Sequence, residues 1–232
     1  MIKKNIIVTG GNKGIGLGLV KKLSKDHNVI FTVRSEEKGN ETLDLLKKIN
    51  ISSEFVVMDV VSSKSVDGAF LEIKNLFKKI DLLINNAGIL IPGLKYNIPA
   101  VETDEDDILK TFNTNTLGVL RVTRYSTPLL SNGSRVINIS SGMGQLNDMG
   151  MGSTAYRLSK TALNALTVIL SQELSPKNIK VNAICPGWVQ TDMGGANADM
   201  TVDESVSNIV EFAFSDDFPT GKYLRNGKIL PW

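Results

Sequence analysis

NIIVTGGNKGIGLGLVKKL (5–23) passes from a β-branched run through a glycine-rich turn into a helical pattern. Gly10, Gly14 and Gly16 lie in the turn. A helix N-terminus offers unpaired N–H groups and a partial positive charge, and glycines remove the Cβ atoms that would keep a phosphate away. The spacing departs from G-x-G-x-x-G, because Leu19 stands where the third glycine would be. The stretch predicts a strand, a phosphate-binding turn and a helix, with tight packing alone as the alternative reason for the glycines.

The rest of the chain alternates between short β-branched runs and longer helical patterns, with Gly, Asn, Asp or Ser at each change. We expect strands at 5–10, 28–34, 54–60, 81–88, 134–141 and 179–187. We expect helices at about 14–26, 36–49, 63–79, 104–130, 154–174 and 202–214, and a loop at 88–103. Strands such as IIVT, DLLIN and VINIS are apolar on both faces, which is typical of a parallel sheet covered by helices on each side. The sequence therefore predicts a doubly wound α/β fold, the Rossmann fold, with about seven strands.

The composition indicates a single domain without broad affinity for charged polymers. The chain has 232 residues, and no repeat or flexible linker divides it, so we expect one domain over 1–232. The net charge is +2, from 26 Lys+Arg and 24 Asp+Glu with interleaved signs, which argues against nucleic acid and membranes as partners. With Cys185 as its one cysteine and a single histidine, the sequence offers neither an internal disulfide nor a Cys/His metal site. Since it shows neither a membrane-spanning apolar run nor a signal-peptide pattern, we expect a cytoplasmic protein.

The end of the second predicted strand bears on the choice of cofactor. In a NAD site, an Asp or Glu at this place accepts hydrogen bonds from the ribose 2′-OH. Here Arg34 occupies it, and its planar guanidinium suits a 2′-phosphate, to which Lys13 in the glycine turn adds a second positive charge. The pattern favours NADP(H). NAD(H) stays open, because Glu36 and Glu37 follow within reach of a ribose.

Tyr156 and Lys160 of AYRLSK (155–160) project from the same face of a predicted helix, because positions i and i+4 are neighbours. A free tyrosine has a pKa near 10, so a phenolate competent at about pH 7 requires about 4 kcal/mol. An ammonium about 6 Å away supplies about 3 kcal/mol at an effective dielectric near 20. A bound, positively charged nicotinamide would provide the remainder. The pair predicts a proton donor to a carbonyl oxygen, with a half-buried tyrosine beside an extended lysine as the alternative.

Six ordered motifs then resemble the short-chain dehydrogenase/reductase family over nearly the whole chain. They are TGGNKGIG (9–16), NNAG (85–88), NTNTLG (113–118), ISS (139–141), YRLSK (156–160) and CPGWVQTDM (185–193). TGGNKGIG is similar to the family's T-G-x-x-x-G-x-G cofactor turn. This similarity accounts for the difference between its glycine spacing and G-x-G-x-x-G. Within the family, the chain looks most like the NADP-preferring, carbonyl-reductase-like branch.

The resemblance implies roles for four catalytic residues. Tyr156 would be the acid/base, and Lys160 would lower its pKa and hold the nicotinamide ribose. Strand alternation lets only one of Ser140 and Ser141 reach the substrate carbonyl. Ser141 matches the family's serine and would hydrogen-bond that carbonyl, with Ser140 as the alternative. Asn115 would position a water in a proton relay.

The residues expected at the cofactor come from the glycine turn and from the ends of several strands. They are Gly10, Asn12, Lys13, Gly14, Ile15, Gly16, Arg34, Asp59, Val60, Asn86, Ala87, Gly88, Tyr156, Lys160, Pro186, Gly187, Val189 and Thr191. Besides the glycines and the Tyr156–Lys160 pair, four of them have alternatives that need no ligand: Arg34 as a solvated surface residue, Asp59 as a cap of the next segment, Asn86 in turn chemistry and Thr191 as an N-cap. We expect no metal.

The substrate itself is not identified by the sequence beyond a small-molecule carbonyl compound. The segments expected to shape its pocket are 90–100, 142–155 and the substrate loop near 189–203. Their apolar side chains indicate an adaptable apolar pocket, with gap filling as the alternative reason for the methionines; they are Met143, Leu146, Met149, Met151, Trp188, Met193 and Met200.

Residues outside the motifs receive simpler interpretations. We expect His27 to be solvated and Cys185 to be a small buried apolar residue, while Trp188 and Trp232 pack near the substrate loop or close the core. The helices at 104–130 and 154–174 are free to pack against a second subunit, which predicts a homodimer or homotetramer.

The sequence favours an NADPH-dependent reductase of ketones or aldehydes. Two other functions stay open: an NADP(H)-binding signalling or scaffold protein of the same fold, and an isomerase or dehydratase that uses the same tyrosine.

Overall fold

A computed structural model of the chain describes residues 2–91 and 98–232. In these residues the strands form one sheet in the order β3-β2-β1-β4-β5-β6-β7-β8, parallel except for the final β7–β8 pair. The strand bounds are β1 Asn5–Val8, β2 Asn28–Val33, β3 Glu54–Val57, β4 Ile80–Asn85, β5 Leu130–Ile139, β6 Lys180–Cys185, β7 Tyr223–Arg225 and β8 Lys228–Leu230. The strand order reverses direction between β1 and β4, and such a switch point is where ligands bind in open α/β sheets.

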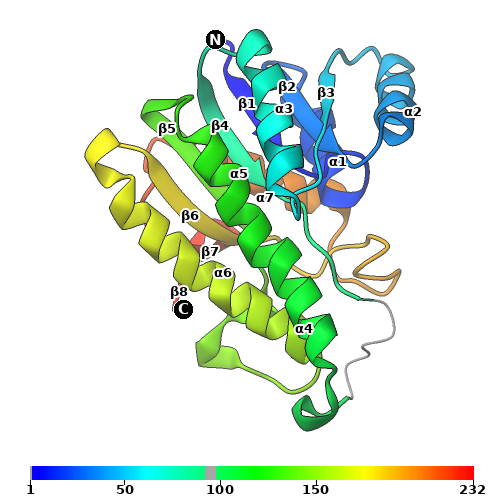
Figure 1. The fold of residues 1–232 in the computed structure, drawn as a ribbon, viewed down its shortest axis with the longest axis vertical. Coiled ribbons are helices and arrows are strands. Elements are labelled where there is room, and N and C mark those ends of the chain that lie inside the picture. Colours follow the sequence, from blue (N-terminus) through cyan, green and yellow to red (C-terminus); the bar gives the residue numbers. More distant parts are fainter. Residues whose placement is uncertain (1, 92–97) are drawn as a thin grey trace.

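Helices cover both faces of the sheet (Figure 1). Their bounds are α1 Gly14–Leu23, α2 Glu36–Lys47, α3 Ser63–Leu76, α4 Glu105–Phe112, α5 Gly118–Ser126, α6 Thr154–Glu173 and α7 Val202–Ala213. Short turns of 3-10 helix add η1 Ala100–Glu102, η3 Gly142–Gly144, η4 Leu146–Asp148 and η5 Ser175–Lys177, and η2 Asn113–Leu117 is a turn of π-helix.

The strands supply side chains alternately to two apolar cores. Ile6 and Val8 of β1 pack with α1 and α7 on one face, whereas Ile7 packs with α3, α5 and α6 on the other. Leu83 and Ile84 of β4 divide between the two faces in the same way. Both faces of the central strands are therefore buried, and the prediction of a doubly wound α/β fold is confirmed.

The sheet has eight strands in the described residues, where about seven were expected. The last two form a hairpin of three-residue strands, too short for a periodic pattern to mark them. Asn226 and Gly227 connect them with positive φ angles of 49° and 71°, as a tight two-residue hairpin turn requires. The sequence signal was this Asn-Gly pair, which the sequence analysis did not use.

The helix expected at 104–130 is interrupted and ends earlier than predicted. Its path runs through α4, the π turn at Asn113–Leu117 and α5, and ends at Ser126. A π turn inserts one residue into the helix and is often found at functional sites. Part of the loop expected at 88–103 cannot be compared, since 92–97 lie outside the described residues.

The expectation of a solvated His27 was wrong. His27 is 9% exposed, and its ring lies 4.7 Å from the ring of Phe214. Burial lowers the pKa of His27. The stretch KDHN (25–28) looked like a surface turn because the aromatic partner lies after α7, far along the chain.

The helices of the described residues are either too short or too polar to span a lipid bilayer.

Candidate active site

The glycine turn between β1 and α1 adopts a conformation that other residues would disturb. Gly10 and Gly14 have φ angles of +67° and +53°, the left-handed region that glycine adopts at low cost. A Cβ on Gly16 would collide with the carbonyl oxygen of Gly10. The amide of Asn86, after β4, donates to the carbonyls of Thr9 and Gly10 at 2.9 and 3.1 Å. Asn86 therefore holds the glycine turn in shape through bonds to residues far from it in the sequence, and not through a turn of its own.

The N-terminus of α1 is open to an anion. Lys13 is the N-cap residue and makes no side-chain cap, and the first turn of α1 contains no acidic residue. The N–H groups and the positive end of the helix are thus available to a phosphate. The Lys13 ammonium lies 2.9 Å from a carboxylate oxygen of Asp192, in the segment after β6. Both side chains are largely exposed, so this ion pair is easily exchanged for another anion.

Arg34 stands directly after β2 with an exposed side chain. Among the described residues it forms no ion pair. Ser35, and not Arg34, caps the following helix α2, by accepting a hydrogen bond from the Lys38 amide. The guanidinium of Arg34 is therefore available at the carboxyl end of β2, next in the sheet to β1.

Asp59, after β3, forms a local turn in which its carboxylate accepts from the Val61 amide at 3.2 Å. The cap of α3 is Ser62. Asp59 therefore caps the short segment before α3, as one of its two interpretations predicted.

Tyr156 and Lys160 lie in the first turns of α6, on the face turned toward the sheet. Tyr156 is 9% exposed and Lys160 4%. The Lys160 ammonium lies 5.6 Å from the centre of the Tyr156 ring and donates to the carbonyl of Ile139, the last residue of β5, at 2.8 Å. Burial lowers the pKa of Lys160 to about 8. At neutral pH a buried ammonium thus stands beside a phenol.

Glycine makes room for this lysine. A Cβ on Gly88 would lie 3.6 Å from the Lys160 ammonium and 3.2 Å from the side-chain oxygen of Asn115. A side chain on Gly144 would press against the backbone of Lys160 itself. Gly88 was expected at the cofactor, whereas the packing role of Gly144 depends on a contact that local sequence does not reveal.

The two serines after β5 have different surroundings. The Ser140 hydroxyl is buried and donates to the side-chain oxygen of Asn164 at 2.6 Å. Ser141 is partly exposed, and its hydroxyl oxygen accepts from the Met143 amide at 3.1 Å. Ser141 therefore has the side chain that a ligand can reach.

Asn115 lies in the π turn and is fully buried. Its side chain exchanges two hydrogen bonds with the backbone of Ile89, at 2.8 and 2.9 Å, and donates to the Ser159 hydroxyl at 3.0 Å. The Asn115 side chain thus joins the segment after β4 to α6. Both hydrogens of the Asn115 side-chain amide are therefore used within the fold.

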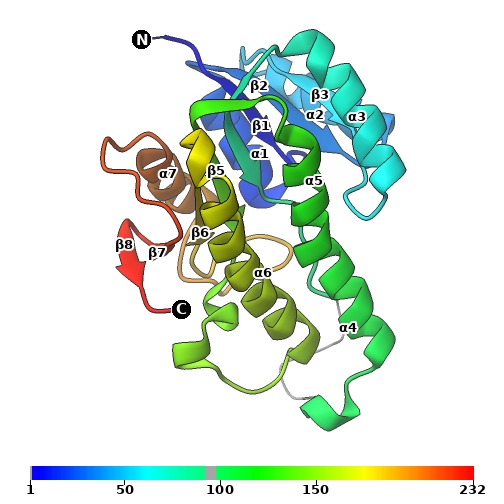
Figure 2. The same ribbon diagram turned by 60° about the vertical axis from the view of Figure 1, so that its left-hand side comes forward.

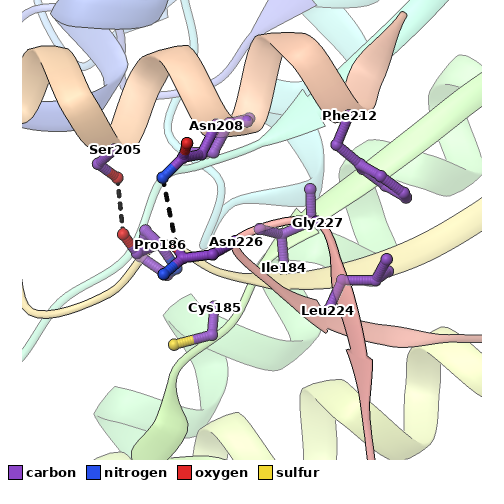
Figure 3. A pocket seen from close by; sticks show the side chains of 10 residues that line it. Ile184, Cys185, Pro186, Ser205, Asn208, Phe212, Leu224, Asn226 and Gly227 are labelled. Atoms are coloured by element: carbon purple, nitrogen blue, oxygen red, sulfur yellow. Dashed lines mark hydrogen bonds between the residues drawn. The ribbon is translucent and has the colours of Figure 1, made fainter. Parts of the chain in front are cut away.

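The Pro186–Gly187 turn after β6 is anchored to α7 (Figure 3). The Ser205 hydroxyl donates to the Pro186 carbonyl at 2.7 Å, and the Asn208 amide donates to Asn226 at 3.3 Å. The cavity between them measures about 10 Å³, the space of about one water molecule, so it is no substrate pocket. Thr191 follows this turn and leans over Gly14, whose added Cβ would lie 3.3 Å from the Thr191 methyl.

The fold thus gathers the glycine turn, the residues after β4, the Ser141 segment, the Tyr156–Lys160 pair and the Pro186–Gly187 turn at the carboxyl edge of the sheet. Comparison with known proteins identifies the arrangement. The model of the short chain dehydrogenase family matches residues 4–202. The chain belongs to the short-chain dehydrogenase family.

Relatives and solved structures of this short-chain dehydrogenase agree with that placement. A 3-oxoacyl-acyl-carrier-protein reductase of Aquifex aeolicus is 31% identical over 221 residues, which cover 94% of this chain and 83% of the relative. The structure of carbonyl reductase Sniffer of D. melanogaster has a TM-score of 0.89 at 30% identity, with both chains fully covered. The NADPH-bound carbonyl reductase from chicken fatty liver has a TM-score of 0.88 at 31% identity, again with full coverage of both chains. The protein is an oxidoreductase, and its likeness to the carbonyl-reductase-like branch is confirmed.

The short-chain dehydrogenase also contains site residues that sequence reasoning missed. Asn164 and Thr161 of α6 both donate to the Gly144 carbonyl, at 3.0 and 3.1 Å. Asn164 lies one turn beyond Lys160 on the same helix face, and this i, i+4 continuation within the apolar run TALNALTVIL was a usable signal.

Arg157 is the second missed residue. Its guanidinium donates to the carbonyls of Gly152 at 2.9 Å and Met143 at 3.4 Å. It thereby ties both ends of the segment between Ser141 and α6 together, and the sequence offered no sign of this, because the acceptors are backbone atoms.

An apolar groove of about 370 Å³ opens beside Arg157. Its walls are Ile98, Pro99, Ala100, Met149, Gly150, Met151, Gly152, Thr154, Arg157 and Leu158. Leu158 points away from the face of α6 that carries Tyr156, because residues i and i+2 of a helix lie on nearly opposite sides. Leu158 therefore lines the groove from a different face of α6 than the one that carries Tyr156.

Proposed function

We propose that this short-chain dehydrogenase reduces a ketone or aldehyde to an alcohol with NADPH. The single observation that carries the proposal is the buried Tyr156–Lys160 pair beside an accessible Ser141, at the same sheet edge as the phosphate turn. A dinucleotide laid from that turn across the edge reaches the pair, because both lie beyond the carboxyl ends of the strands.

The residues present fit NADP(H). Gly16 leaves the space against Gly10 that a side chain would fill, and the first turn of α1 is uncapped. Arg34 and Lys13 carry exposed positive charges at the carboxyl ends of β2 and β1, where a 2′-phosphate would be recognised. The backbone around Gly88, Pro186 and Gly187, with Asn12, Ile15, Val60, Ala87, Val189 and Thr191, would enclose the rest of the cofactor.

In the proposed reaction the protein supplies the proton and holds the substrate. NADPH, when bound, supplies the hydride. Ser141 would donate a hydrogen bond to the substrate carbonyl, and Tyr156 would protonate its oxygen. The Lys160 ammonium would stabilise the phenolate that remains and hold the nicotinamide ribose. The relay that returns a proton would begin at the backbone of Asn115 in the π turn.

The apolar side chains at this end of the molecule indicate the substrate class. Leu146, Met149, Trp188 and Met193 are 42–65% exposed, although all four are apolar. Exposed apolar groups around a polar centre are typical of a ligand site for apolar molecules. An aromatic or aliphatic carbonyl compound fits this description. The segment near 189–203 would be the substrate loop. The cytoplasm remains the predicted location of the protein.

Steady-state kinetics with purified protein test the proposal. NADPH oxidation is followed with a panel of aromatic aldehydes, ketones and quinones, and again with NADH. We expect turnover with NADPH and formation of the alcohol. Tight NADPH binding without reduction of any carbonyl would contradict the proposal and favour a binding module or an isomerase.

We predict that kcat/KM for NADPH, at saturating carbonyl, falls as the pH rises above about 8. The lowered pKa of about 8 means that Lys160 carries its charge below this pH and loses it above. kcat/KM reports the ionisation of the free enzyme, so the loss is visible in this parameter. The measurement is a pH–rate profile, with Lys160→Arg as the control whose charge persists. A wild-type profile that stays flat through pH about 9.5 would contradict the assignment.

We also predict a dimer or tetramer formed through α4 and α6. Leu109 of α4 and Leu158 of α6 are 64% and 50% exposed. Light scattering should give a mass of at least twice 25.2 kDa, and Leu158→Lys should lower it. Leu71→Lys is the matched control, since Leu71 is a 60% exposed leucine on α3. A clean monomer for the wild type would refute the prediction.

A further inference from the structure

The segment between Ser141 and α6 is bonded to the residues that follow β8. The backbone amide of Asn147 donates to the Trp232 carbonyl at 3.1 Å. The side-chain amide of Gln145 donates to the Pro231 carbonyl at 3.0 Å. Figure 2 shows the C-terminal end beside the turns that follow β5.

Trp232 is in turn anchored to the sheet. Its ring lies 5.8 Å from the ring of Tyr223 in β7, at an angle of 31°. Tyr223 is fully buried, and with Ala183 and Cys185 it forms a separate apolar cluster onto which Leu230 and Trp232 pack. Burial raises the pKa of Tyr223, so its phenol stays neutral at any ordinary pH. The Trp232 indole therefore packs against a buried, uncharged tyrosine.

The apolar cluster of Ala183, Cys185 and Tyr223 also contacts the turn that follows Ser141. The Gly142 amide donates to the Cys185 sulfur at 3.1 Å. Figure 3 shows the Cys185 sulfur pointing away from α7, consistent with its place in the cluster on the other side of β6. One apolar cluster thus supports both Gly142 and the residues that hold Asn147.

Helix α6 holds the segment between Ser141 and α6 near both of its ends, but it does not hold residues 145–148 in the middle. Gly144 is bonded to Thr161 and Asn164, and Gly152 is bonded to Arg157. Within the described residues, the hydrogen bonds that tie 145–148 to other parts of the fold are those to Pro231 and Trp232. Leu146, at 65% exposure, adds no compensating burial.

We propose that Pro231 and Trp232 are positioning residues for carbonyl reduction, and this inference rests on the proposed function. They hold 145–148, and through it the Ser141 turn and the apolar side chains beside it. The substrate carbonyl is thereby held where the Tyr156 hydroxyl can protonate its oxygen. The phosphate turn lies at β1, four strands away from β7 in the sheet order, so we expect the phosphate contacts of NADPH to be independent of these residues.

Kinetics of three variants test the positioning role. A chain that ends at Leu230 loses both carbonyl acceptors, and we expect KM for the carbonyl to rise about tenfold, while kcat changes less than about threefold. The dissociation constant of NADPH should stay within about twofold of the wild-type value. Trp232→Phe in the full-length chain keeps an aromatic ring and both carbonyl acceptors, so its KM should stay near the wild-type value. Ile229→Ala is the control, an exposed apolar residue of the same hairpin. An unchanged KM in the shortened chain, or equal loss of NADPH affinity, would overturn the proposal.

Hydrogen exchange separates this proposal from failure of the proposed function, since it needs no turnover. In the NADPH complex, amides of 142–148 should exchange faster in the shortened chain than in the wild type, while those of α1 stay unchanged. Equal exchange of 142–148 in the two proteins would overturn the positioning role even if carbonyl reduction is established. If the wild type reduces no carbonyl, the proposed function itself is wrong.

Discussion

Replacement of Tyr156 by phenylalanine should lower kcat for carbonyl reduction about a thousandfold, a loss within the range expected for a general acid. The change removes one oxygen and keeps the ring of a residue that is nine-tenths buried. Without the phenol, the oxygen of the reduced carbonyl has no proton donor held beside the Lys160 ammonium. The measurement is single-turnover NADPH oxidation at saturating carbonyl.

Two controls make this result specific. NADPH affinity, measured by fluorescence, should change less than about twofold, because the fold and the phosphate turn are intact. Tyr125→Phe removes the hydroxyl of a tyrosine on α5 whose ring stacks on Phe70, and should keep nearly full activity. If Tyr156→Phe retains more than about a tenth of the wild-type rate, another group is the proton donor.

Replacement of Arg34 by serine should lower kcat/KM for NADPH about a hundredfold and leave that for NADH nearly unchanged. The reason is the loss of charge-assisted hydrogen bonds to the 2′-phosphate, which NADH lacks. Arg34 is exposed and forms no ion pair among the described residues, so the free energy of unfolding should change little. The measurement compares both cofactors with one carbonyl substrate.

The matched control is Arg124→Ser, which removes an exposed arginine from α5. Lys13→Gln should have a smaller effect than Arg34→Ser, because Lys13 must first leave Asp192. An equal loss of kcat/KM with NADPH and with NADH would show that Arg34 does not bind the 2′-phosphate. A wild type that prefers NADH would overturn the choice of cofactor altogether.

Much of the fold was predictable because the strands are buried on both faces. The runs IIV, LLIN and VINI need helices on each side, and the glycine turn marks the first strand-to-helix connection. β7 and β8 were missed because three residues give no period. The π turn at Asn113–Leu117 was missed because it follows from the packing of buried Asn115 between Ile89 and Ser159.

The candidate site was predictable where chemistry depends on local spacing. Tyr156 and Lys160 share a helix face through their i, i+4 separation, whatever the rest of the fold does. The contacts of Cys185 and Trp232 were not predictable, because each joins segments far apart in the sequence through a backbone atom. The contact of Arg157 with Gly152 is local, but its acceptor is also a backbone atom. Hydrogen bonds to backbone atoms leave no residue-type signature at the partner.

The central claim is that hydride from NADPH and a proton held by Tyr156 convert a carbonyl into an alcohol. Transfer of deuterium tests it most directly: purified protein is incubated with NADPH deuterated at nicotinamide C4 and an aromatic ketone or aldehyde, and the product is analysed by mass spectrometry and NMR. We predict an alcohol with deuterium on the carbinol carbon, formed in equal amount to the cofactor oxidised. Recovery of unreduced carbonyl, or of an isomer without deuterium, from a protein that binds the cofactor would contradict the account.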